Sequence, residues 1–168
     1  ELWNKSINWK NGIDVLINNA GINSREDWVK QADPSVWNNV IGSNLNATYN
    51  ATSLLLPLLV RKTSSIINIS SVLGQEGVSD QPAYCAAKHG IIGLSKSLSG
   101  MLAPEGITVN AICPGWIDTP MLTKRAKELN ITKIDIINSI PTKKITTCFD
   151  IAQLAIFLSG ESARNITG

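Results

Sequence analysis

The sequence predicts an α/β fold: a doubly wound parallel sheet covered by helices on both faces, in three layers. Three short apolar runs, at residues 13–17, 66–70 and 107–112, lack the alternation of half-buried strands and are typical of strands buried on both faces. Stretches with apolar residues at helical spacing separate these runs. Because strands and helices alternate along the chain, we expect three parallel neighbouring strands joined by right-handed crossovers.

Composition supports one globular domain over residues 1–168 and argues against several functions. Hydrophobic residues make up 43% of the chain and charged residues 17%, which is typical of a domain with a sizeable core. The net charge of +2 is spread without a basic run, which argues against a nucleic-acid partner and a basic membrane-binding patch. The longest apolar stretch, residues 54–60, contains Pro57 and is too short to span a bilayer.

The three cysteines are Cys85, Cys113 and Cys148, and they lack the spacing of metal ligands. An odd number of cysteines also argues against a disulfide framework. We therefore predict small buried thiols in a reducing compartment, which favours a cytoplasmic location. We also predict that the protein has no catalytic metal.

The first strand leads into a candidate ligand loop. Apolar residues within 2–10 predict the end of a helix, and the run 13–17 is followed by Asn18-Asn19-Ala20-Gly21. Ligands of open α/β sheets bind at the carboxyl ends of the strands, so this loop is a candidate binding segment. An asparagine-rich turn without a binding role is the alternative.

A long helical stretch follows the loop. Asp33 is a typical N-cap residue, Pro34 suits a first helical turn, and apolar residues at helical spacing continue to about residue 60. Asn44 lies among these apolar residues. A buried amide needs hydrogen-bond partners, so Asn44 either bonds the local backbone, for example at a helix kink, or belongs to a site.

The second strand ends at Ser71, and Pro82 begins a helix that continues to about residue 103. Tyr84 and Lys88 stand four residues apart and therefore share a face of this helix. A neighbouring ammonium lowers the pKa of a tyrosine from its usual value of about 10, which would make Tyr84 a proton donor and acceptor near neutral pH. The same spacing also occurs in ordinary amphipathic helices, so the pair gains meaning from the residues around it.

The third strand is followed by a turn at residues 113–115. Asp118 or Thr119 then caps a further helix, which has Pro120 in its first turn. Residues 147–150 have the pattern of a capping box and predict the start of the last helix.

Five features in this order and spacing resemble the short-chain dehydrogenase/reductase family, and within it the 3-oxoacyl-carrier-protein reductases. They are Asn18–Gly21, Asn44, Ser71, the pair Tyr84 and Lys88, and the run Asn110–Gly115 with Thr119–Met121. The likeness covers the chain from about Gly12 to Gly168 and implies a Rossmann-like NAD(P)-binding domain. It also implies reversible hydride transfer between NAD or NADP and a carbonyl or alcohol.

The family's glycine-rich cofactor turn and last strand have no counterpart in these residues. The resemblance therefore implies a partial domain, which we expect to be inactive and poorly soluble by itself. The substrate, and the choice between NAD and NADP, cannot be inferred from the residues present.

The resemblance implies a role for each matching residue. Ser71 would hold the substrate oxygen, Tyr84 would transfer the proton as general acid or base, Lys88 would lower the pKa of that tyrosine and bind the ribose, and the Asn44 carbonyl would hold a water of the proton relay. The implied cofactor contacts are Asn18, Ala20, Gly21, Tyr84, Lys88, Pro114, Gly115, Ile117 and Thr119. Residues 123–146 would form a substrate lid.

Other functions receive less support. The only histidine, His89, follows Lys88 and so points away from the proposed active face, and no G-x-S-x-G elbow is present, which argues against a hydrolase. A reductase-like scaffold that binds or regulates without catalysis is the alternative function. Small residues in the second helix indicate close helix packing, so we expect a homo-oligomer, a dimer or tetramer, formed through helices 35–60 and 82–103.

Overall fold

The computed structural model describes residues 12–60 and 62–168, so the helix end predicted within residues 2–10 lies outside the described residues. One parallel sheet lies at its centre, with the strand order β1 (Val15–Asn18), β2 (Ser65–Ile69) and β3 (Thr108–Ile112). The prediction of three parallel neighbouring strands is confirmed, and each observed boundary lies within two residues of the predicted one.

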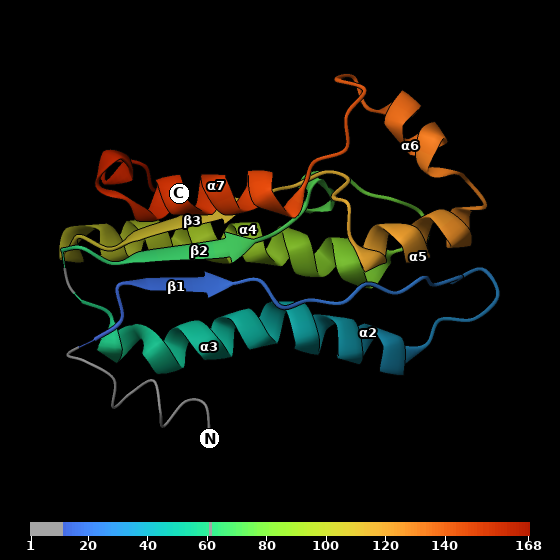
Figure 1. The fold of residues 1–168 in the computed structure, drawn as a ribbon. Helices are drawn as coiled ribbons and strands as arrows, with labels where there is room; N and C mark the ends of the chain where they lie inside the picture. Colours follow the sequence, from blue (N-terminus) through green and yellow to red (C-terminus); the bar gives the residue numbers. More distant parts are fainter. Residues whose placement is uncertain (1–11, 61) are drawn as a thin grey trace.

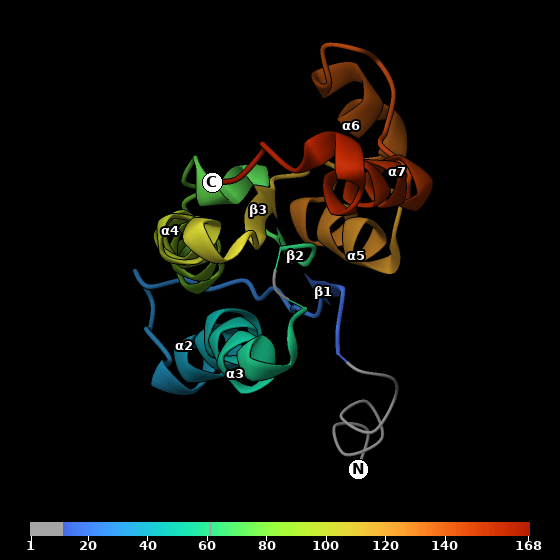
Figure 2. The same ribbon diagram turned by 90° about the vertical axis from the view of Figure 1, so that its left-hand side faces the viewer.

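Helices cover both faces of this sheet, which confirms the three-layer prediction (Figures 1 and 2). One face carries α3 (Ala47–Leu55), preceded by α2 (Pro34–Ile41), together with the long helix α4 (Pro82–Leu102). The other face carries α7 (Cys148–Ser159). The helices α5 (Pro120–Leu129) and α6 (Lys133–Ser139) lie beyond the carboxyl ends of the strands (Figure 1).

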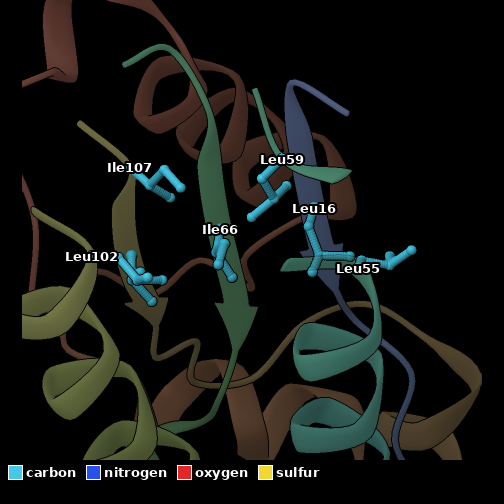
Figure 3. Close-up of a cluster of buried hydrophobic side chains, with 7 residues drawn as sticks. Leu16, Leu55, Leu59, Ile66, Leu102 and Ile107 are labelled. Atoms are coloured by element: carbon cyan, nitrogen blue, oxygen red, sulfur yellow. The ribbon is translucent and has the colours of Figure 1, made fainter. Parts of the chain in front are cut away.

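Adjacent isoleucines of β2 enter opposite cores because side chains alternate across a strand. Ile66 packs with leucines of α3 and α4, as Figure 3 shows, and Ile67 packs against Ala155 and Leu158 of α7. Both isoleucines are fully buried. Burial of one such side chain contributes about 1.5–3 kcal/mol, so β2 is held from both sides and its carboxyl end has a fixed place.

The polar side chains within the sheet are paired by a chain of hydrogen bonds. The Asn18 amide donates to Asn68 Oδ1 at 2.8 Å and to Thr52 Oγ1 at 3.0 Å, and the Asn68 amide donates to Ser95 Oγ at 2.9 Å. These bonds link β1, β2, α3 and α4. They leave Asn68 fully buried without an unpaired amide group.

The helix signals of the sequence were mostly correct. Asp33 caps α2 by accepting from the Ser35 amide at 2.8 Å, and Thr147 with Asp150 forms the capping box of α7. Between α2 and α3 the chain makes a π-helical turn at Gly42–Asn46, and Asn44 lies within this turn. Turns of this kind are common at functional sites.

The cysteine prediction was only partly correct. All three cysteines are free thiols and Cys85 is buried, but Cys113 is half-buried and Cys148 is exposed. Cys148 stands in the first turn of α7, outside the face that packs on the sheet. Within the described part of the chain, no helix is long and apolar enough to cross a membrane and no cluster of side chains could hold a metal ion.

The buried amide chain gives a stability prediction. Asn68→Ala leaves one N–H of Asn18 without its acceptor and creates a small cavity, so we expect the free energy of unfolding to fall by about 2–4 kcal/mol. Urea unfolding measures this change, and the exposed Asn165→Ala is the matched control. An unchanged midpoint for Asn68→Ala would show that the amide chain does not hold the sheet.

Candidate active site

A cavity of about 580 Å³ opens where the three strands end and α5 begins. Four parts of the chain line it: the loop after β1, the π-helical turn, the end of β2 with the start of α4, and the segment from β3 into α5. The sequence-predicted residues on its wall are Gly21, Asn44, Ser71, Tyr84, Lys88, Pro114, Gly115, Ile117 and Thr119.

Ser71 and Tyr84 face each other across this cavity. Ser71 follows β2, and its Oγ accepts from the Leu73 amide at 3.1 Å, which starts a short 3₁₀ turn and fixes the side chain. Tyr84 stands in the first turn of α4, where its hydroxyl group interacts with the Ser71 hydroxyl group. Lys88 lies one turn further, with Nζ 5.5 Å from the centroid of the Tyr84 ring. All three side chains line the same cavity, and their roles stay predictions.

The expected effect of Lys88 on Tyr84 is wrong for this structure. Burial raises the pKa of Tyr84 above its usual value, and the hydrogen bond with Ser71 only partly opposes this rise. The Lys88 ammonium instead donates to the carbonyl oxygen of Ile69 at 2.8 Å, and burial lowers its own pKa to about 8. Desolvation is the largest cause of both shifts, and Lys88 is not among the causes of the Tyr84 pKa shift. The prediction was wrong because spacing along a helix does not reveal how deeply two side chains are buried.

Asn44 is fully buried in the π-helical turn, and its side chain is only partly paired. Its amide nitrogen donates to the carbonyl oxygens of Val40 at 2.7 Å and Ile22 at 2.9 Å, whereas Oδ1 has no partner. The main-chain carbonyl of Asn44, which the resemblance assigns to a water relay, accepts from Thr48 Oγ1 at 2.8 Å. The Ala47 amide also donates to this carbonyl, so both of its usual acceptor positions are occupied in the free protein.

The loop after β1 approaches Asn44 closely at Gly21. A Cβ atom on Gly21 would lie 2.5 Å from Asn44 Oδ1 and 3.6 Å from Lys88 Nζ, so only glycine fits here without displacing a site residue. Asn19 and Gly21 line the cavity, but Asn18 and Ala20 do not. The Asn18 amide is used within the sheet and Ala20 is exposed, and their cofactor contacts stay predictions.

The opposite wall comes from the segment after β3. The Pro114 carbonyl accepts from the Val72 amide at 2.9 Å, which joins the ends of β2 and β3. Thr119 occupies the N-cap position of α5, as one of the two predicted alternatives, but its side chain makes no capping bond. Its hydroxyl group donates to the Ile117 carbonyl at 3.3 Å and stays on the cavity wall.

Sequence reasoning missed the polar residues that join the start of α4 to α5. Arg125 is buried, lines the cavity, and binds both oxygens of Asp80 at 2.9 and 2.7 Å. Glu128 lies 3.4 Å from the same guanidinium, and Glu26 accepts from the Ala83 amide at the start of α4. The sequence offered one indication that this side chain is buried: Arg125 stands between Leu122 and Ala126, which belong to an apolar cluster.

The comparisons with known proteins agree with this geometry. The family model described as "Enoyl-(Acyl carrier protein) reductase" matches residues 2–168. The chain is 37% identical over 167 residues to D-beta-hydroxybutyrate dehydrogenase of Rhizobium meliloti (strain 1021), and this match covers 94% of the chain and 64% of that protein. It is 39% identical over 160 residues to the 3-oxoacyl-[acyl-carrier-protein] reductase FabG of Chlamydia trachomatis serovar D. This match covers 94% of the chain and 62% of that protein.

A solved structure of actinorhodin polyketide ketoreductase with NADPH superimposes with a TM-score of 0.92 at 32% identity, over 99% of this chain and 67% of that one. The chain therefore belongs to the short-chain dehydrogenase/reductase family. It spans less than two thirds of the length of these two curated relatives.

The buried ammonium gives a second stability prediction. The pKa of Lys88 is about 8 in the fold and 10.5 as a free side chain, so the folded state binds fewer protons between these values and its stability rises with pH in this range. Below pH 8 the buried charge costs on the order of 3 kcal/mol, partly offset by its hydrogen bond to Ile69. We expect Lys88→Met to raise the free energy of unfolding at pH 7 and to lose this advantage towards pH 10.

Urea unfolding at pH 7, 8.5 and 10 measures this effect, and the exposed Lys96→Met is the control. A gain for Lys88→Met that does not change with pH would contradict the lowered pKa.

Proposed function

We propose that the protein is an NAD(P)-dependent oxidoreductase that transfers a hydride reversibly between the cofactor and a carbonyl or alcohol. Residues 1–168 would be part of its NAD(P)-binding domain. The observation that carries this proposal is the hydroxyl pair of Ser71 and Tyr84 in one cavity with the Lys88 ammonium. The names of the relatives support it, since they include a dehydrogenase and a reductase, as does the NADPH in a similar structure.

The cavity fits the nicotinamide end of the cofactor on features of its own. A side chain at Gly21 would collide with Asn44 Oδ1, which is a buried acceptor without a donor, and the Lys88 ammonium lies beside the same glycine. Such a donor and acceptor set suits the hydroxyl groups of a ribose. Tyr84 and Lys88 would hold the ribose, Ile117 and Thr119 the carboxamide, Pro114 and Gly115 the ring, and the loop Asn18–Gly21 the adenosine side.

The bound cofactor would supply or accept the hydride, and the residues of the chain would do the proton chemistry. Ser71 would donate a hydrogen bond to the substrate oxygen and hold it beside the phenol. Tyr84 would then donate its proton during reduction, and its raised pKa keeps this proton in place at neutral pH. Lys88 would stabilise the phenolate that remains. The Asn44 carbonyl, which accepts from Thr48 and Ala47 in the free protein, would have to release one of these donors to hold the water that returns a proton.

The decisive test is Tyr84→Phe in the full-length protein. Deleting the hydroxyl group removes the proton donor and conserves the ring, so we expect turnover to fall by at least about a thousandfold while the melting temperature changes little. NAD(P)H absorbance with a panel of ketones and 3-oxoacyl esters measures turnover, and Tyr49→Phe, at an exposed tyrosine, is the control. Near-normal turnover of Tyr84→Phe would instead favour the scaffold function without catalysis.

We also propose that the protein is a cytoplasmic homo-oligomer, a dimer or tetramer, that acts on a small carbonyl or alcohol and binds no nucleic acid. Its helices 35–60 and 82–103 carry exposed apolar side chains, namely Trp37, Tyr49, Leu54 and Met101. Gly90 packs against Leu45 of the same chain, but Gly93 and Gly100 face open space, so another helix could approach α4 there. The free cysteines support a reducing compartment.

Gly93→Arg tests this assembly. A bulky charged side chain on the outer face of α4 has room in the monomer, so the fold should persist while the oligomer dissociates. Sedimentation of the full-length protein at micromolar concentration measures the change, with the exposed Lys96→Arg as control. A wild-type monomer under these conditions would contradict the proposed interface.

A further inference from the structure

The helix α5 forms one wall of the cavity without belonging to either core of the sheet. Its residues Met121, Leu122 and Arg125 line the cavity. Leu122 packs with Ile136 of α6 in a separate apolar cluster, whose members all lie between residues 116 and 145. Figure 1 shows α5 and α6 together beyond the carboxyl ends of the strands. The place of this wall therefore depends on the contacts that join α5 to the rest of the protein.

Two arginines make these contacts. Arg125 binds both carboxylate oxygens of Asp80, at 2.9 and 2.7 Å. Arg25, in the loop after β1, lies 3.4 Å from the same carboxylate and donates to the main-chain carbonyl of Glu128 at 3.2 Å. In the part of the chain that the structure describes, no other hydrogen bond or ion pair joins α5 or α6 to an element outside residues 116–146.

The pair of Arg125 and Asp80 can fix the orientation of α5 as well as its distance. Two hydrogen bonds from one planar guanidinium to one carboxylate allow a single relative orientation. Both side chains are largely buried, with 10% and 20% of their surfaces exposed. The hydrogen bond from Arg125 lowers the pKa of Asp80, so the carboxylate is charged at neutral pH.

Asp80 is itself held at the start of α4, four residues before Tyr84. Its main-chain carbonyl accepts from the Glu26 amide at 2.9 Å, and Glu26 Oε1 accepts from the Ala83 amide in the first turn of α4 at 3.3 Å. The carboxylate therefore projects from a segment with a fixed place. Arg125 thus connects the α5 wall directly to the element that carries Tyr84.

We propose that Arg125 and Asp80 are positioning residues, which hold the α5 wall of the cavity against the start of α4 and do not contact the substrate. The pair keeps the free protein in the arrangement that binds a substrate. Without it, α5 and α6 would spend part of the time displaced from Tyr84, and the apparent affinity for substrate falls with the fraction of molecules that can bind. The inference rests on the proposed function and adds to it a cause of substrate affinity outside the contact residues.

The first test is hydrogen exchange of the full-length protein without any ligand. Arg125→Met keeps an unbranched side chain and removes the guanidinium, and Asp80→Asn keeps the side-chain shape and removes the charge. We expect the amides of α5 to exchange at least about tenfold faster in either variant, because its local opening becomes easier when a charged hydrogen-bonded pair is lost. The amides of β2 should keep their rates, since that strand is held by both cores.

The double variant, Arg125→Met with Asp80→Asn, leaves neither charge buried without its partner. Because both substitutions break the same interaction, α5 should exchange no faster in the double variant than in the single ones. The matched control is Lys30→Met. It removes a cation whose ion pair with Asp27 lies within one exposed loop, so it should change neither exchange nor kinetics.

Steady-state kinetics of the same variants show whether the wall matters for binding. The substrates are cyclohexanone, 2-heptanone and ethyl 3-oxobutanoate, with NADPH and NADH. For each substrate that the wild-type protein reduces, we expect Arg125→Met to raise KM by at least about tenfold and to change kcat by less than about threefold. A residue that merely supports the fold would lower the melting temperature and kcat through loss of active protein, and KM would stay the same.

The outcomes distinguish this inference from the proposed function. Unchanged exchange of α5 in both single variants would overturn the proposed joint. Faster exchange with an unchanged KM would overturn the positioning role and leave the oxidoreductase in place. Absence of turnover with every substrate in the wild-type protein would overturn the proposed function and the role of the pair in substrate binding, whereas the exchange rates would still decide whether the pair holds α5.

Discussion

Burial of β2 on both faces is the constraint on which the rest of this structure depends. Ile66 faces the helices α3 and α4, and Ile67 faces α7, so the strand cannot shift by one residue without exchanging its two cores. Such a strand has no access to water for its polar groups, and each therefore needs a partner inside the protein. The amide of Asn68 meets this need by linking the first strand to α4.

The same strand determines where the reactive groups stand. At its carboxyl end the Ile69 carbonyl accepts from Lys88 Nζ, and Ser70 Oγ donates to the main-chain carbonyl of Lys88, so α4 is bound to β2 at two points. A Cβ atom on Gly74 would lie 2.7 Å from Ser70 Oγ and 2.8 Å from that carbonyl, so the turn after β2 must also pass close to the helix. Ser71 and Tyr84 face each other because this joint leaves no freedom in how the strand meets the helix.

How far apart two interacting residues lie in the sequence decides whether their contact could be predicted from the sequence. Strands, caps and the grouping of Ser71 with Tyr84 depend on neighbours in the sequence or on the end of a strand, and they were predictable. The pairing of Arg125 with Asp80 joins residues 45 positions apart, and that of Glu26 with Ala83 joins residues 57 apart. No pattern in the local sequence predicts such pairs. The direction of the Tyr84 pKa shift was missed for a related reason, because burial is a property of the assembled fold.

The unpaired polar groups complete this picture. Among the side chains that the structure describes, three buried nitrogen or oxygen atoms lack a partner: Asn44 Oδ1, Gln81 Nε2 and Arg164 Nη1. The first two border the cavity, and Arg164 does not line it. One is an acceptor beside Lys88 and Gly21, and the other is a donor one turn before Tyr84. The buried amide of Asn68, by contrast, has a partner on both its nitrogen and its oxygen. Asn44 Oδ1, beside Lys88 and Gly21, is an acceptor that the proposed cofactor could pair. The cost of leaving this oxygen unpaired in the free protein would then return as binding selectivity, because a molecule that lacks the matching donor leaves the cost in place.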